Sequence, residues 1–103
     1  MRTVITFGTS SREELVDITE QVREIVFQHG AGYKLCALYA LGATAAIIIQ
    51  ENRDPHIQTD VLECLRSIAP RGRWQHDQID GYEDGHIKAG LVGPSETIPI
   101  EKG

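Results

Sequence analysis

Side chains that can bind a metal ion or transfer a proton gather in residues 74–95, whose sequence is WQHDQIDGYEDGHIKAGLVGPS. His76 and Asp77 are adjacent, and His86 follows them within the same stretch. Imidazole and carboxylate groups are ligands for zinc and for other divalent ions. Because the histidines do not stand one turn apart on a single helix, their spacing leaves two interpretations open, a metal site and a solvated polar loop.

The end of this stretch offers a position for an anion. Asp84 precedes His86 and Lys88 at the start of the segment HIKAGLV, whose apolar residues have helical spacing. With Asp84 as the N-cap, the His86 and Lys88 side chains would lie beside the first free N–H groups of the helix. The pattern therefore predicts that this segment binds phosphate or a similar anion.

Two further segments have the apolar spacing and the end signals of helices. Residues 18–26 place apolar side chains on one helical face, with Asp17 or Thr19 as N-cap and Gly30 as the end. The second helix begins at Asp54, an N-cap that a proline follows at the first helical position, and it ends at Pro70. Its inner face is predicted to consist of Ile57, Val61, Leu65 and Ile68.

Short apolar or β-branched runs predict the strands. Residues 35–41 and 44–49 are apolar runs bounded by turns, which indicates strands buried on both faces. Further strands are expected at residues 3–7, 14–17 and 97–101. Strands and helices in this mixed order indicate an α+β fold, in one domain that spans residues 1–103.

The chain is acidic, with 15 acidic against 10 basic side chains and a formal net charge of -5. Such a chain is not expected to bind nucleic acid or an anionic membrane surface. Its longest apolar runs are much shorter than a membrane span, and its first residues lack the pattern of a signal peptide. We therefore expect a cytoplasmic protein with neither a nucleic-acid nor a membrane partner.

Four segments together resemble the YjbQ-like family over nearly the whole chain: VDITEQVREIV, TAAIIIQENRDPHIQTDVLECL, WQHD and DGHIKAGLVGPSETIPIEKG. The resemblance implies an antiparallel two-sheet core flanked by helices, and assembly as a homotrimer. Members of the family continue through a further pair of strands. The resemblance therefore implies either a chain that lacks the last strands or a sheet that closes in another way.

The resemblance also implies a function, secondary thiamine-phosphate synthase activity. This transferase reaction joins a pyrimidine diphosphate to a thiazole phosphate, so a phosphorylated small molecule is the expected partner. His76, Asp77 and His86 would be catalytic, and His76 and His86 would hold a divalent ion, zinc or Mg²⁺. The residues expected to contact the ligand are Thr44, Glu51, Asn52 and Lys88.

One position departs from the family pattern. In the family a histidine precedes the segment that corresponds to residues 44–46, and here Gly42 occupies its place. Two functions from different classes therefore stay open. One is a weak or impaired transferase, and the alternative is a non-catalytic member of the family that binds a ligand or a protein.

Overall fold

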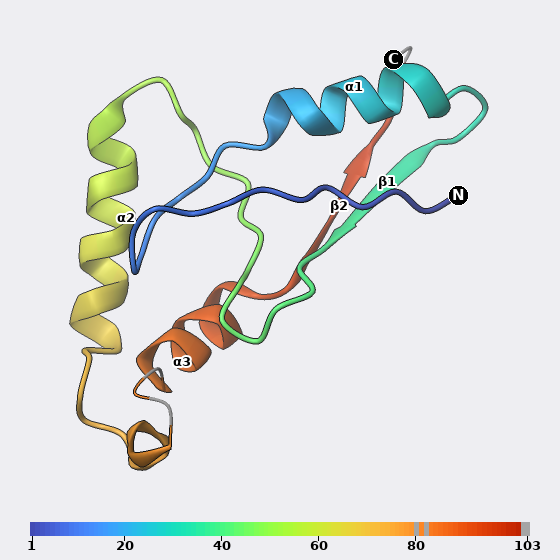
Figure 1. Cartoon of the computed structure of the whole chain (residues 1–103). Coiled ribbons are helices and arrows are strands. Elements are labelled where there is room, and N and C mark those ends of the chain that lie inside the picture. The colour runs from blue at the N-terminus through green and yellow to red at the C-terminus, as the bar shows by residue number, and fades with distance from the viewer. Residues whose placement is uncertain (80, 82, 102–103) are drawn as a thin grey trace. The chain divides into compact units, whose positions relative to one another are not determined.

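The computed structural model describes all residues except 80, 82, 102 and 103. The chain divides into two compact units, one formed by Met1–Ala37 with Thr97–Gly103 and the other by Leu38–Glu96. The single domain expected from the sequence stays a prediction. Figure 1 shows the elements, which are α1 (Thr19–His29), β1 (Leu35–Tyr39), α2 (Pro55–Ile68), the 3-10 helix η1 (Gln75–Gln78), α3 (Glu83–Val92) and β2 (Ser95–Pro99).

β1 and β2 pair as a two-stranded antiparallel sheet. Backbone hydrogen bonds flank the pair at both ends, from the Ala40 N–H to the Pro94 carbonyl and from the Ile100 N–H to the Lys34 carbonyl, each 2.8 Å long. Helices and an antiparallel sheet confirm the α+β class. Of the two sheets that the resemblance implies, the described residues form this one.

β1 differs from the prediction of a strand buried on both faces. Burial alternates along the strand, and Leu35 and Tyr39 are 63% and 66% exposed. β2 has the same alternation, and it begins at Ser95, two residues before the predicted start. The reason is that a strand is buried on both faces only where other elements cover both sides of its sheet.

Three predicted strands, at residues 3–7, 14–17 and 44–49, are not strands in the structure. A strand forms when a neighbour takes up its N–H and C=O groups, and β-branched composition alone does not supply that neighbour. In residues 44–49, the Ile47 N–H donates instead to the carbonyl of Gly93, at 3.1 Å, just after α3. The segment is therefore bonded to the chain just after α3 rather than to a neighbouring strand.

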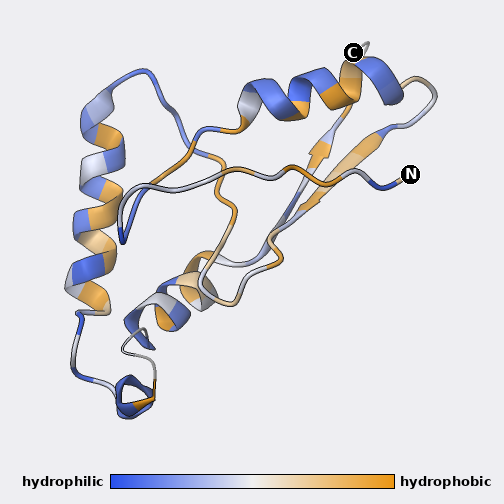
Figure 2. Cartoon of the chain, viewed as in Figure 1, coloured by the Kyte–Doolittle hydropathy of each residue, from blue (hydrophilic) through white to orange (hydrophobic). Residues whose placement is uncertain are grey.

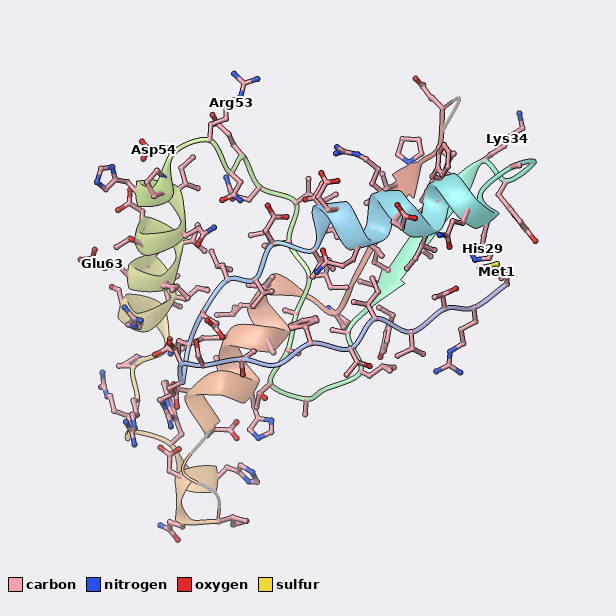
Figure 3. All side chains as sticks on the ribbon, turned by 45° about the horizontal axis from the view of Figure 1, so that its top comes forward. Met1, His29, Lys34, Arg53, Asp54 and Glu63 are labelled. Atoms are coloured by element: carbon pink, nitrogen blue, oxygen red, sulfur yellow. The ribbon has the colours of Figure 1, made fainter. Side chains whose placement is uncertain are left out.

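The predicted start of the second helix is confirmed in α2. The Asp54 side chain accepts a hydrogen bond from the His56 N–H at 2.9 Å, and Pro55 is the first helical residue. Figure 3 marks this start by Arg53 and Asp54, and Figure 2 shows apolar and polar residues alternating along the helix. The last residue, Ile68, is exposed rather than part of the inner face, and Ala69 after it is fully buried.

α3 begins at Glu83, so the prediction of Asp84 as its N-cap is wrong. Asp84 lies inside the first turn and is only 1% exposed, and its Oδ2 accepts a hydrogen bond at 2.9 Å from the Nζ of Lys88, which is 8% exposed. The two side chains stand four residues apart, where helical neighbours meet. Because a charge away from water must be paired, each of these groups satisfies the other on the buried side of the helix.

Large apolar side chains are exposed in both units, among them Val4, Phe7, Phe27, Ile48, Ile49 and Leu91. The predicted homotrimer would cover part of this surface. The homotrimer stays a prediction.

Among the described residues, no helix combines the length and the apolar character that crossing a bilayer requires.

Replacing Asp54 by alanine should lower the free energy of unfolding by about 1 kcal/mol, because the N-cap bond to the His56 N–H is lost. Urea unfolding followed by circular dichroism measures the change. Asp60→Ala, an exposed position inside the same helix, is the matched control and should have little effect. Equal losses in the two variants would contradict the capping role.

Replacing Lys88 by methionine should lower the free energy of unfolding by about 3 kcal/mol, because Asp84 would keep a buried charge without its cation. Lys34→Met, at an exposed lysine that Figure 3 labels, is the control and should stay within about 0.5 kcal/mol. The double variant Asp84→Leu/Lys88→Met should lose less than the sum of its two single variants. Additive losses would show that the two side chains do not interact.

Candidate metal centre

The short helix η1 fixes the backbone around His76. The Asp77 N–H donates to the Trp74 carbonyl at 3.1 Å, and the Ile79 N–H donates to the His76 carbonyl at 2.9 Å. Before this turn, the indole Nε1–H of Trp74 donates to the Pro70 carbonyl at 2.7 Å. Both the segment that follows α2 and the turn itself are therefore held by hydrogen bonds, and His76 lies on this turn.

The first turn of α3 supplies the other two groups, Glu83 and His86. They are three residues apart in the sequence, so they lie on the same edge of the helix. η1 and α3 contact each other and belong to the same compact unit. The contact brings His76 to the edge of α3 that carries the two side chains.

The three side chains form a group that could hold a metal ion. One ligand atom from each of His76, Glu83 and His86 lies within 4.8 Å of the other two, and all three residues are half-buried. The two imidazole rings meet edge to face, with centroids 5.1 Å apart and an interplanar angle of 82°. The structure therefore brings together His76 and His86, the two residues that the resemblance implies would hold a divalent ion.

The spacing of these atoms is wider than a tetrahedral ion requires, by an amount that side-chain rotation can close. Ligands about 2.1 Å from a zinc ion are about 3.4 Å from each other, so side-chain movements of about 1 Å would close the group around an ion. Two nitrogens and one carboxylate oxygen would leave one position of a tetrahedral ion open. The described residues therefore contain three of the four ligands that such an ion needs.

Asp77 differs from the role expected of it. Its Oδ2 accepts a hydrogen bond from the Trp74 N–H at 3.1 Å, and its Oδ1 accepts one from the Glu83 N–H at 3.0 Å. Asp77 is not a member of the group of potential metal ligands. A carboxylate that caps two backbone segments has a structural contact at each oxygen, and this arrangement does not support the catalytic role predicted from the sequence.

Thr44 and Gly42 lie on a turn that reaches α3. The Ala45 N–H donates to the Gly42 carbonyl at 3.3 Å, and the Thr44 Cγ2 lies 3.4 Å from where a Cβ on Gly85 would be. The turn therefore packs against the backbone that joins Glu83 to His86. Gly42 is not among the glycines with positive φ, and a Cβ there would lie 3.5 Å from the Ala45 Cβ, an ordinary contact.

Glu51, Asn52 and Lys88 are not brought into this group. Asn52 accepts a hydrogen bond from the Gln58 side chain at 2.7 Å, and Lys88 bonds to Asp84. Figure 1 shows the segment before α2 at the opposite end of that helix from η1, and 14 helical residues span about 20 Å. A role for these residues in ligand binding stays a prediction, without support from their positions.

Glu83 is the site residue that sequence reasoning missed. The signal was present, since a glutamate three residues before a histidine places both on one helical edge, as in the Glu-x-x-His pairs of metal-binding helical bundles. The prediction of Asp84 as the helix cap conceals this signal. With Asp84 as the N-cap, Glu83 would lie outside the helix.

Comparison with known sequences identifies relatives over almost the whole chain. A family model described as "UPF0047 protein YjbQ-like" matches residues 3–103. A UPF0047 protein of Methanocaldococcus jannaschii is 37% identical over 95 residues, which make up 92% of this chain and 68% of that protein. The UPF0047 protein YugU of Bacillus subtilis is 31% identical over 98 residues, 92% of this chain and 72% of that one.

Solved structures give the same relationship. An uncharacterized conserved protein of the yjbq/upf0047 family from Clostridium acetobutylicum superposes with a TM-score of 0.85 at 34% identity, covering 92% of this chain and 73% of that one. A YbjQ-like protein of unknown function from Sulfolobus solfataricus superposes with a TM-score of 0.88 at 30% identity, covering 93% and 70%. The similarity therefore extends from the sequence to the fold.

The prediction of a thiamine-phosphate synthase is wrong. These relatives are described only as UPF0047 proteins, as uncharacterized or as of unknown function, and none of the descriptions names a synthase or another transferase. Lys88, expected to neutralise a diphosphate, is bonded to Asp84. The alternative, a member that binds a ligand or a protein, fits these findings better. By the match over residues 3–103, the chain belongs to the YjbQ-like UPF0047 family.

Proposed function

We propose that the protein is a ligand-binding member of its family whose ligand is a divalent transition-metal ion, with zinc as the first candidate. The observation that supports the proposal is the convergence of ligand atoms from His76, Glu83 and His86 within 4.8 Å of one another. These residues come from two elements that are hydrogen-bonded to each other through Asp77. A hydrogen bond between η1 and α3 therefore helps to hold the three side chains near one another.

The donor set favours zinc over Mg²⁺. Magnesium prefers oxygen ligands and retains much of its water, whereas imidazole nitrogen suits zinc and neighbouring transition metals. Two histidines and one glutamate are a donor set that zinc sites with one open position use. Of the two ions expected from the sequence, zinc is the one that these three side chains would hold.

The fourth coordination position of the proposed metal ion would be available to another ligand. Water or an anionic oxygen could occupy it, and a phosphate oxygen of a phosphorylated small molecule belongs to this class. In this proposal the partner binds through the metal, and Lys88 takes no part. The homotrimer and the cytoplasmic location are kept as predictions from the sequence.

Replacing Glu83 by glutamine should weaken zinc binding at least tenfold, about 1.4 kcal/mol, because a neutral amide oxygen is a poorer ligand than a carboxylate. Calorimetric titration with zinc measures the change. Glu63→Gln, at an exposed glutamate on α2 that Figure 3 labels, is the matched control and should bind zinc as the unaltered chain does. Unchanged affinity in Glu83→Gln would remove this residue from the site, and absence of zinc binding by the unaltered chain would refute the proposal.

Replacing Gly42 by histidine should raise zinc affinity at least tenfold, because the new imidazole could fill the open position. The backbone permits this change, since Gly42 does not have a positive φ and its turn packs against Gly85 in the first turn of α3. Zinc titration beside thermal unfolding separates tighter binding from altered folding. A folded variant with unchanged affinity would mean that position 42 does not face the metal group.

A further inference from the structure

The carboxylate of Asp77 connects η1 and α3, the two elements that carry the potential metal ligands His76, Glu83 and His86. The Oδ2 of Asp77 accepts a hydrogen bond from the Trp74 N–H, at the start of η1, over 3.1 Å. Its Oδ1 accepts one from the N–H of Glu83, the first residue of α3, over 3.0 Å. Asp77 is half-buried, so these bonds compete less with water than exposed ones would.

Each of the three potential ligands lies on a segment that one of these two bonds holds. His76 precedes Asp77 in η1, so the bond to Trp74 fixes the turn from which the imidazole projects. Glu83 donates the other bond with its own N–H, and His86 follows in the same helical turn. A carboxylate with two backbone donors therefore sets the distance between the turn that carries His76 and the helix that carries Glu83 and His86.

We propose that Asp77 is a positioning residue that holds His76, Glu83 and His86 at metal-binding distance without touching the metal itself. The proposal rests on the proposed function, because positioning has meaning only if the group binds an ion. Carboxylates that orient metal ligands from outside the coordination sphere commonly change metal affinity 10–100-fold when removed. Asp77 orients through the backbone rather than through an imidazole N–H, and it does so on both sides of the site.

A capping aspartate elsewhere in the chain separates positioning from ordinary stabilisation. Asp54 accepts the His56 N–H at 2.9 Å at the start of α2, and it does not belong to the metal group. Removing either carboxylate breaks backbone hydrogen bonds and lowers stability. Of the two aspartates, Asp77 is the one that accepts backbone hydrogen bonds in both segments that carry the ligands, so its removal should also change metal binding.

The test compares zinc affinity by calorimetry in Asp77→Ala, Asp77→Asn and Asp54→Ala, each at a temperature where unfolding curves show it folded. Asp77→Ala should bind zinc at least tenfold more weakly, and Asp54→Ala should stay within about twofold of the unaltered chain. Asp77→Asn keeps one acceptor oxygen, so its affinity should fall between those of Asp77→Ala and the unaltered chain. Unchanged affinity in folded Asp77→Ala would overturn the proposal.

The absorption spectrum of bound Co²⁺ distinguishes positioning from direct ligation, because it reports the ligand set and geometry rather than the affinity. At saturating cobalt, Asp77→Ala should retain the spectrum of the unaltered chain, whereas Glu83→Gln should change it. A spectrum altered in Asp77→Ala in the same way as in Glu83→Gln would make Asp77 a ligand and overturn the positioning role.

A measurement on the unaltered chain covers the case in which the Asp77 variants do not fold. If the Asp77 bonds favour metal binding, metal binding must favour those bonds by the same free energy. Zinc should therefore slow hydrogen exchange of the Trp74 amide, and it should leave the His56 amide, which Asp54 caps, unchanged. Zinc binding without added protection at Trp74 would overturn the positioning role and leave the proposed function standing. Failure of the unaltered chain to bind zinc would refute the proposed function itself.

Discussion

The buried ion pair between Asp84 and Lys88 determines which way α3 faces. Successive residues of a helix are rotated by about 100°, so fixing two of them on the buried side fixes the direction of all the others. Glu83 and His86 then lie on a different edge of the helix, the one that meets η1. Breaking the Asp84–Lys88 pair would leave a buried charge without its partner, which is costly. This cost opposes a rotation of α3 that would turn Glu83 and His86 away from η1.

The metal group combines this constraint with a second one, the Asp77 carboxylate. The ion pair orients α3 about its own axis, and the two bonds of Asp77 set where its first residue lies relative to η1. The Thr44 side chain packs against the same turn of the helix, since a Cβ on Gly85 would lie 3.4 Å from its Cγ2, an ordinary contact distance. Asp84 and His86, in the same turn of α3, therefore have different tasks: Asp84 is paired with Lys88 on the buried side, and His86 belongs to the potential metal group.

The helices could be predicted where their signals are local. Asp54 followed by Pro55 marks a helix start that needs no distant partner, and α2 begins there. The Asp84 cap failed because an aspartate four residues before a lysine satisfies two rules at once, that of an N-cap and that of a helical ion pair. In the structure Asp84 is buried and forms the helical ion pair rather than the N-cap. Burial depends on segments that are distant in the sequence, so local signals could not predict this outcome. The strand expected at residues 44–49 failed for a related reason, since its partner had to come from elsewhere in the chain.

The site could be predicted in part. His76 and His86 lie together, but the carboxylate that completes the potential metal group is that of Glu83, and Asp77 beside His76 accepts hydrogen bonds from two backbone N–H groups. The amino-acid sequence indicates that a carboxylate lies near the two histidines. It does not indicate which of the several aspartates and glutamates in the stretch provides this carboxylate. Family membership was predicted correctly, whereas the activity attached to it was not, because the function of a site depends on its own geometry rather than on the fold that carries it.

Crystallographic anomalous scattering at the zinc absorption edge tests the central claim most directly, since it locates an ion without assuming its ligands. Crystals grown with zinc should show one strong peak at about 2.0–2.2 Å from an atom of each of His76, Glu83 and His86. Asp77 should remain on the Trp74 and Glu83 amides in that structure. A zinc peak elsewhere in the molecule, with these three side chains unoccupied, would contradict the account.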